Sequence, residues 1–259
     1  PLINIIKFAC HACPEKRILI TNGCQGCLEH PCIEVCPKKA IHMENGRSII
    51  DQDKCIKCGK CVSACPYNAI IKQERPCAKA CGMNAIEYGR ADIDYEQCVS
   101  CGMCLVSCPF SAIVDKSQIF QTVLALKSDT PIYAAIAPSF VNQFGGAVTS
   151  AQVRAALKAV GFEDMIEVAV GADLCAIQEA EDFLEEVPEK IPFMGTSCCP
   201  AWSVMAKKTF PEYANCISMA LTPMVLTGRM IKKDHPDCKV VFIGPCAAKK
   251  LEASRRSVR

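Results

Sequence analysis

Cysteines placed at fixed short intervals constrain this chain more than any other feature. Two units share one form, four cysteines separated by two, two and three residues and then a proline: Cys55, Cys58, Cys61, Cys65 and Pro66, and Cys98, Cys101, Cys104, Cys108 and Pro109. A third unit is two residues wider in its middle, with Cys24, Cys27, Cys32, Cys36 and Pro37. Such internal repeats indicate that one small structural module is used several times.

A fourth copy is recognised by its tail. Four residues after the last cysteine, every unit continues with Ala-Ile, at Ala40-Ile41, Ala69-Ile70, Ala85-Ile86 and Ala112-Ile113. The copy that ends at Ala85 contains only Cys77-x3-Cys81. Because Cys10-x2-Cys13 is the unassigned pair nearby, we expect it to complete this copy.

The spacing itself indicates iron–sulfur chemistry. Three thiolates two residues apart can wrap a [4Fe–4S] cube, because a tight loop presents each sulfur to a different iron, and the cysteine before proline ligates the cluster of the partner half. Zinc sites also use Cys-x2-Cys pairs. Repeated four-cysteine runs closed by proline favour the cluster over zinc.

The repeats resemble those of bacterial two-cluster ferredoxins over about residues 5–115. The resemblance implies α+β ferredoxin-like iron–sulfur modules with crossed ligation, and up to four [4Fe–4S] clusters. The implied ligand sets are Cys55, Cys58, Cys61 and Cys36; Cys24, Cys27, Cys32 and Cys65; Cys98, Cys101, Cys104 and Cys81; and Cys10, Cys13, Cys77 and Cys108. Four oxidised clusters would change the formal net charge from +2 to roughly −6.

Composition excludes several other classes. The 22 cysteines are about 8.5% of the 259 residues, a density also seen in disulfide scaffolds, but those are short secreted chains. No run of 18 apolar residues is present, so we predict no membrane span. The net charge of +2 gives no electrostatic case for binding nucleic acid.

The region after residue 130 shows a different pattern, in which apolar strands alternate with helical segments. Strands are predicted at residues 132–136, 165–170 and 239–243, and helices at 149–160, at 173–187 and from Thr222 towards Lys233. Alternation of this kind predicts a largely parallel sheet. Ligands bind at the carboxyl ends of such strands. We expect both cysteine-bearing loops, at 196–202 and 245–252, to follow strands and to converge there.

Those two loops resemble the first two signatures of the [FeFe]-hydrogenase catalytic domain. The first is Thr196-Ser197-Cys198-Cys199-Pro200-x-Trp202, and the second is Pro245-Cys246-x-x-Lys249-Lys250-x-Glu252. The match covers about residues 130–259, and ferredoxin modules upstream are also the family arrangement. It implies an α/β catalytic domain, of which this chain holds the first half.

The resemblance also implies a role for each residue. Cys199 and Cys246 would be two of the four ligands to the [4Fe–4S] part of the H-cluster, which also has a diiron site with CO and cyanide ligands. Cys198 would shuttle a proton to the diiron site, and Lys249 would pair with a cyanide. The loop lining that site would include Ala137, Pro138 and Ser139.

Onward proton transfer in the family uses two carboxylates and a hydroxyl. Glu179 and Asp182 lie three apart, hence on one helix face, and Ser218 is the matching hydroxyl candidate. An acidic helix face is also often merely solvated. Asp182 stands where the family usually has Glu.

Two departures from the family pattern matter. Gly244 replaces the Met that usually precedes Pro-Cys in the second signature, which indicates a divergent subgroup. The third signature, Glu-x-Met-x-Cys-x-x-Gly-Cys, is absent. We therefore expect a hydrogenase fragment that is inactive by itself.

The expected division of the chain follows from these motifs. It comprises residues 1–45 as a cysteine-rich half-module, 46–75 as a [4Fe–4S] ferredoxin-type domain, 76–88 as a partial half-module, 89–118 as a second ferredoxin-type domain, 119–130 as a linker and 131–259 as the N-terminal half of the catalytic domain.

The expected function is reversible H2 oxidation and proton reduction, with the ferredoxin-type clusters carrying electrons to and from the active site. The resemblance implies a ferredoxin or similar low-potential electron carrier as partner, a maturation machinery for the diiron site, and the cytoplasm of an anaerobe. Three alternatives stay open: a non-catalytic relative that acts in iron–sulfur assembly, a hydrogen sensor, and a polyferredoxin electron carrier. Cys175, Cys216 and Cys238 have no cluster assigned and are expected to be buried structural thiols.

Overall fold

The computed structural model describes residues 2–10, 13, 16–86, 92–255 and 258. The chain forms two compact units. The first, here called the cluster unit, consists of Ile5–Gln97 and Met103–Val114, and the second, the sheet unit, consists of Pro1–Asn4, Cys98–Gly102 and Asp115–Arg259. The domain boundary expected at residues 88–89 lies outside the described residues.

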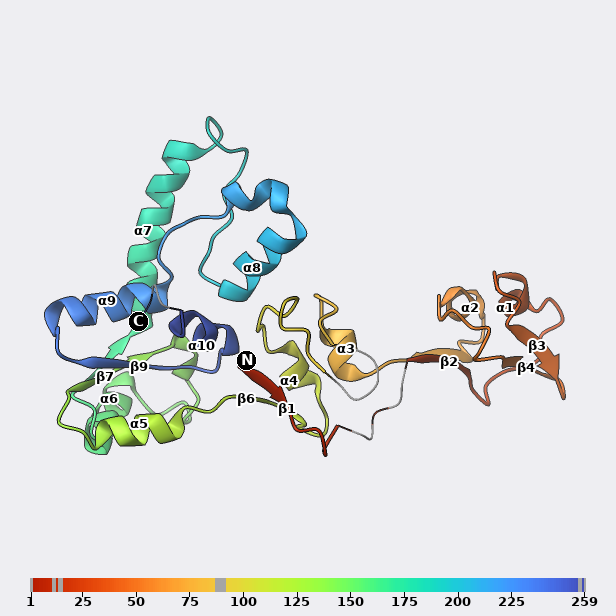
Figure 1. Cartoon of the computed structure of the whole chain (residues 1–259), viewed down its shortest axis with the longest axis horizontal. Helices are drawn as coiled ribbons and strands as arrows, with labels where there is room; N and C mark the ends of the chain where they lie inside the picture. The colour runs from red at the N-terminus through yellow and green to blue at the C-terminus, as the bar shows by residue number, and fades with distance from the viewer. Residues whose placement is uncertain (1, 11–12, 14–15, 87–91, 256–257, 259) are drawn as a thin grey trace. The chain divides into compact units, whose positions relative to one another are not determined.

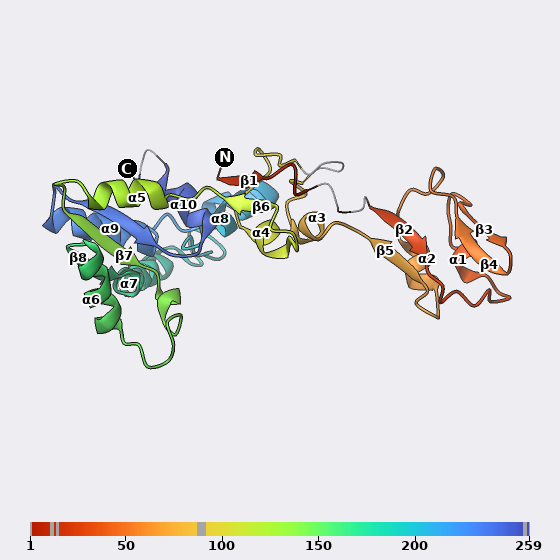
Figure 2. The same cartoon turned by 90° about the horizontal axis from the view of Figure 1, so that it is seen from below.

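The cluster unit consists of small antiparallel ladders and short helices. Strand β2 (Arg17–Ile20) pairs with β5 (Ile70–Gln73), and β3 (Ile41–Glu44) pairs with β4 (Arg47–Ile50), as Figure 2 shows. The β3–β4 hairpin turns at Asn45 and Gly46, both with positive φ, which is the geometry that two-residue turns require. The helices are α1 (Pro31–Glu34), α2 (Lys60–Ala64), α3 (Pro76–Ala80) and α4 (Met103–Ser107).

The Cys-x3-Ala-Ile tails form the same structure in all four repeats. The Ala and Ile of each tail are between 1% and 5% exposed, and the residue before each Ala has a positive φ, at Lys39, Asn68, Asn84 and Ser111. In three tails the Ala N–H donates a 3.3 Å hydrogen bond to the cysteine Sγ four residues earlier, in the pairs Ala40–Cys36, Ala85–Cys81 and Ala112–Cys108. The tail therefore orients the last cysteine of the unit.

Strand β1 (Ile3–Ile5) pairs with β6 (Ile113–Asp115), and the division between units passes through both strands. In the cluster unit the Ile6 N–H donates to the Ala112 carbonyl at 2.8 Å, and in the sheet unit the Lys116 N–H donates to the Leu2 carbonyl at 2.7 Å.

The sheet unit is built on a parallel sheet in the order β8-β7-β9, from β7 (Ile132–Ile136), β8 (Asp164–Glu167) and β9 (Lys239–Ile243). Its helices are α5 (Ile119–Leu126), α6 (Ser150–Val160), α7 (Val168–Glu186), α8 (Pro200–Thr209), α9 (Pro223–Asp234) and α10 (Ala247–Ala253), with 3-10 turns η1 (Pro138–Phe140) and η2 (Pro211–Cys216). The predicted α/β architecture with a parallel sheet is confirmed.

Helices cover both faces of this sheet. Successive side chains of a strand point to opposite faces, so neighbouring residues of β7 pack against different helices. On one face Ala134 of β7 packs with Val153 of α6, and Leu126 of α5 joins the cluster. On the other face Ala135 packs with Val168 of α7 and Ile231 of α9. Figure 1 shows α5 and α6 on one side of the sheet and α7 and α9 on the other.

The helix boundaries follow local signals. Thr149 caps α6 through a capping box with Gln152, and Gly161 ends it with φ 116°. The Thr222 side chain caps α9, which begins at Pro223. These predicted boundaries are confirmed.

Three expectations are corrected by the structure. The strand predicted at residues 165–170 ends at Glu167, because Val168 already begins the long helix α7. Residues 119–126 of the expected linker form α5, whose Leu126 packs on the sheet. The loop at residues 196–202 follows only an isolated bridge between Gly195 and Ile217 rather than a regular strand. Among the described residues, no helix combines the length and the apolarity that crossing a bilayer requires.

Candidate functional site

The first predicted ligand set surrounds one small cavity in the cluster unit. Cys36, Cys55, Cys58 and Cys61 all line it, together with Ile18, Ile41 and Ile50 of the neighbouring strands. Burial raises the pKa of the Cys61 thiol, and the negative charges of Cys55, Cys58 and Cys36 raise it further. The structure therefore brings together three cysteines of one repeat and the last cysteine of the preceding one.

The second predicted set surrounds a separate cavity in the same unit. It is lined by Cys24, Cys27, Cys32 and Cys65. Ser48 of β4 lies against it, with its hydroxyl 3.4 Å from the Cys32 Sγ. A hydrogen bond from the Ser48 backbone lowers the pKa of Cys24, which favours the thiolate that ligates metal.

The predicted set of Cys10, Cys13, Cys77 and Cys108 also lies in the cluster unit. Burial raises the pKa of Cys77, and the negative charges of Cys10, Cys108 and Cys13 add to this rise. These four thiols are therefore near neighbours, although Cys10 and Cys108 are almost a hundred residues apart in sequence. The predicted set of Cys98, Cys101, Cys104 and Cys81 stays a prediction, because the first two cysteines belong to the sheet unit and the last two to the cluster unit.

These sites fit a [4Fe–4S] cluster in their donor set and burial. Each of the two cavities is lined by four thiols and isoleucine side chains, with no carboxylate among the lining residues. Within the described residues, no three ligating side chains stand close enough to hold a single metal ion. A cube does not require that proximity, because each of its irons takes one cysteine.

In the sheet unit, the loop at residues 196–202 is held by hydrogen bonds to several elements. The Ser197 N–H donates to Glu179 Oε1 of α7 at 3.4 Å, and the Ser197 hydroxyl donates to the Ala220 carbonyl at 3.2 Å. The Trp202 indole N–H donates to the Thr196 carbonyl at 3.0 Å. Cys198 and Cys199 are both exposed, and Cys199 directly precedes α8. The loop therefore leaves both thiols accessible while its backbone is fixed.

The second cysteine-bearing loop follows β9 and leads into α10. Cys246 directly precedes this helix. Lys249 forms a 2.8 Å ion pair with Glu252, which also accepts a 3.1 Å hydrogen bond from the Thr222 hydroxyl. Both side chains of the ion pair are largely buried. Glu252 thus fixes Lys249 and joins the start of α9 to α10.

Three of the residues predicted for proton transfer and for the diiron site influence the thiol of Cys175 in α7. Burial raises the pKa of the Cys175 thiol; the negative charge of Glu179 raises it further, Lys249 opposes this, and Cys198 adds to it. Three residues from three separate elements therefore lie within electrostatic range of one thiol. Sequence reasoning treated Cys175 only as a structural thiol. It is buried, as are Cys216 and Cys238, and its thiol donates a 2.9 Å hydrogen bond to the Leu221 carbonyl.

The loop after β7 meets the loop after β9, because these two strands are neighbours in the sheet. The Ala137 N–H donates to the Ile243 carbonyl at 2.9 Å. A Cβ placed on Gly244 would lie 3.0 Å from the Ala137 Cβ and 2.8 Å from the Phe242 ring. Pro138 and Ser139 form the exposed turn η1 that follows.

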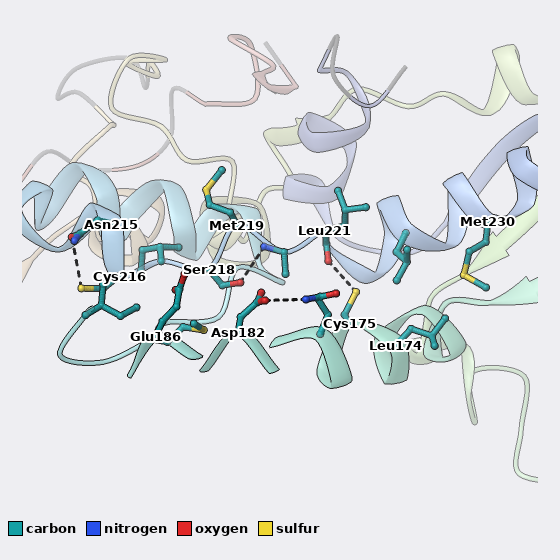
Figure 3. A pocket seen from close by; sticks show the side chains of 16 residues that line it. Leu174, Cys175, Asp182, Glu186, Asn215, Cys216, Ser218, Met219, Leu221 and Met230 are labelled. Carbon is teal, nitrogen blue, oxygen red and sulfur yellow. Dashed lines mark hydrogen bonds between the residues drawn. The ribbon is translucent and has the colours of Figure 1, made fainter. Parts of the chain in front are cut away.

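The other residues of the predicted relay line a larger cavity of about 770 Å³, shown in Figure 3. Asp182 and Ser218 are both among its lining residues. Asp182 accepts a 2.9 Å hydrogen bond from Gln178, and the Ser218 hydroxyl accepts one from the Ala220 N–H at 3.1 Å. Glu179 does not line this cavity and contacts Ser197 instead. The structure thus separates the two carboxylates of the relay.

Comparison with protein families matches three segments of the chain. Residues 130–259 match the model "Iron only hydrogenase large subunit, C-terminal domain", residues 48–71 match "4Fe-4S binding domain", and residues 71–119 match "LdpA Fe-S cluster-binding domain".

Individual relatives agree with these matches. The chain is 33% identical to "Iron hydrogenase 1" of Clostridium pasteurianum over 82% of its own length and 40% of that protein. It is 33% identical to "Periplasmic [Fe] hydrogenase large subunit" of Nitratidesulfovibrio vulgaris over 81% of its length and 52% of that protein. It is also 30% identical to "Cytosolic Fe-S cluster assembly factor NAR1" of Candida dubliniensis over 39% of its length and 19% of that protein. The chain thus spans about half or less of each of these relatives.

Proposed function

Because the chain belongs to the iron-only hydrogenase large subunit family, we propose that it is part of an enzyme that interconverts H2 with protons and electrons. The observation that carries this proposal is that residues 130–259 match the hydrogenase family model and that the Ser197 N–H, beside Cys198, donates to Glu179 of α7 at 3.4 Å. When bound, the active-site cluster would supply the redox chemistry. The chain would hold this cluster in place, carry protons to and from it, and connect it to the ferredoxin-type clusters that carry electrons.

Cys199 and Cys246 would hold the active-site cluster, each placed by the helix that follows it. Cys198 would donate and accept the proton at its Sγ, since it is an exposed thiol directly after Ser197, whose N–H donates to Glu179. The Glu179 carboxylate also fixes the adjacent Ser197 N–H, which orients the loop. Lys249 would present its ammonium group to the anionic part of the cluster, with Glu252 holding the Lys249 side chain in place.

Electrons would reach this site through ferredoxin-type clusters on the sixteen repeat cysteines. Within the sheet unit, a Cβ on Gly102 would lie 3.8 Å from the Ala247 Cβ, so the residues directly after Cys101 and Cys246 are neighbours. The cluster that includes Cys101 would therefore exchange electrons with the active site. A ferredoxin-like carrier of low potential would serve as the external partner.

Replacing Cys198 by Ala in the complete, matured protein tests the catalytic proposal. A general acid–base group contributes about 10²- to 10⁴-fold to rate, so we expect H2 evolution from a reduced dye to fall by at least 100-fold. The infrared bands of iron-bound CO and cyanide should persist, because Cys198 is not proposed as a ligand. Cys238→Ala is the matched control, since it removes a buried thiol that packs on the sheet. Full activity in the Cys198→Ala enzyme would exclude the proton-transfer role.

The similarity to an iron–sulfur assembly factor supports a second candidate function, cluster assembly without hydrogen chemistry. The two functions differ in what they require of Cys198. An assembly protein would bind its [4Fe–4S] clusters, show no CO or cyanide bands after maturation, and be insensitive to Cys198→Ala.

A further inference from the structure

Three of the four buried side-chain nitrogen and oxygen atoms without a hydrogen-bond partner, among the described residues, occur at one position of the cysteine repeat. They are Nε and Nη1 of Arg75 and Nδ1 of His30. Arg75 precedes Pro76-Cys77, and His30 precedes Pro31-Cys32. The recurrence indicates that this position faces a group that the side chains of the protein do not provide.

Arg75 is the more demanding case because its side chain is a permanent cation. The residue is only 5% exposed, and an arginine does not lose its proton in proteins. A buried cation without a partner is costly. The neighbouring carboxylate of Glu74 is held by Lys16 at 3.6 Å and Lys72 at 3.2 Å. The cation therefore requires another anion.

We propose that Arg75 is the counter-charge of the [4Fe–4S] cluster held by Cys10, Cys13, Cys77 and Cys108. This inference rests on the proposed cluster ligation. Arg75 stands two residues before Cys77, itself a buried thiol whose neighbours are the other three cysteines. An oxidised cube with four thiolates carries a net charge of about −2, which makes it the largest local anion. Arg75 is thus a positioning residue for the electron relay rather than a ligand.

The charge of Arg75 has a consequence for electron transfer. Reduction adds one electron and one negative charge to the cluster, and a nearby cation stabilises this reduced state. Arg75 therefore raises the reduction potential of this cluster relative to the same cluster without it. The cluster is therefore easier to reduce by an external carrier than it would be without Arg75.

The test is an EPR-monitored redox titration of the full chain, loaded anaerobically with iron and sulfide. In Arg75→Gln we expect the reduced-to-oxidised ratio of one cluster to fall about tenfold at a fixed potential, which corresponds to about 59 mV for one electron. Arg75→Lys keeps the charge and should shift this ratio by less than threefold. The shifted signal should be the one that disappears in Cys10→Ser.

Arg17→Gln is the matched control, because it removes an equal charge from the same unit at an exposed side chain that bonds to Gln73 at 2.7 Å. It should change no ratio by more than twofold. If Arg75→Gln loses this cluster while Arg75→Lys retains it, the charge is required to hold the cluster, which also supports the proposal. If both variants keep the wild-type potential, or both lose the cluster alike, the proposal is overturned. A wild-type chain without about sixteen irons would instead contradict the proposed clusters themselves.

Discussion

Replacing Gly171 by Ala should destabilise the sheet unit, although alanine is ordinarily the better helix former. Gly171 lies buried inside α7, where a Cβ would stand 2.2 Å from the Thr227 Oγ1 and 2.7 Å from the Pro223 carbonyl oxygen. Both atoms belong to α9, so the two helices would have to separate by on the order of 1 Å to restore ordinary contact. Overpacking of this severity costs about 3 kcal/mol, and the helix propensity of alanine offsets about 1 kcal/mol. The expected net loss is about 2 kcal/mol.

The assay is unfolding in urea followed by fluorescence of Trp202, the single tryptophan of the chain, which reports on the sheet unit. Gly228→Ala is the matched control, because a Cβ there would have no neighbour within 4 Å, so this variant should gain up to about 1 kcal/mol. Adding Thr227→Ala to Gly171→Ala should recover roughly half of the loss, since it removes the closer clash. Equal stabilisation by both glycine replacements would refute the close approach of α7 and α9.

Two further predictions concern the same unit. The Arg154–Asp164 ion pair lowers the pKa of Asp164 to about 2. The stabilisation that the ion pair gives is therefore present above the unfolded pKa of about 3.9 and is lost as the pH falls towards 2. Because both side chains are partly exposed, a double-mutant cycle with Arg154→Gln and Asp164→Asn should give a coupling energy of about 0.5 kcal/mol at pH 7 and the same at pH 5. A coupling that fades between these two pH values would contradict this sign. Gly244→Met, which introduces the family residue, should lower the free energy of unfolding by about 1–3 kcal/mol because its Cβ meets the Phe242 ring. Adding Phe242→Ala should relieve that strain. A Gly244→Met variant as stable as the wild type would show instead that the loop has room for methionine.

The cysteine pattern predicted more of the cluster unit than propensities alone can. The resemblance to two-cluster ferredoxins implied the crossed sets containing Cys36 and Cys65, and the structure places each of these cysteines beside the partner repeat. The αL residue before each tail alanine could not be foreseen, because Lys39 and Ser111 carry no turn signal comparable to glycine. Only the fold shows that this turn aims the alanine N–H at sulfur.

In the sheet unit, prediction succeeded where the signal was local and was wrong where tertiary packing decided. The helix predicted at residues 149–160 is α6, which the structure shows to be capped by Thr149 and ended by Gly161. Residues 165–170 are a short run that is apolar except for Glu167, a pattern that does not distinguish a buried strand from a buried helix turn, and α7 begins inside it. Cys175 lacked any motif, because its neighbours come from distant segments of the chain.

The contact at Gly171 connects the stability of the sheet unit to the chemistry of the site. Gly171 lies against the Pro223 carbonyl, one residue after Thr222, whose hydroxyl binds Glu252. Glu252 in turn holds Lys249 at 2.8 Å. The same helix α7 carries Cys175, so a shift between α7 and α9 would change the distance from Lys249 to this thiol, whose pKa it influences. A glycine far from the cysteine motifs is therefore expected to set the geometry in which those motifs act.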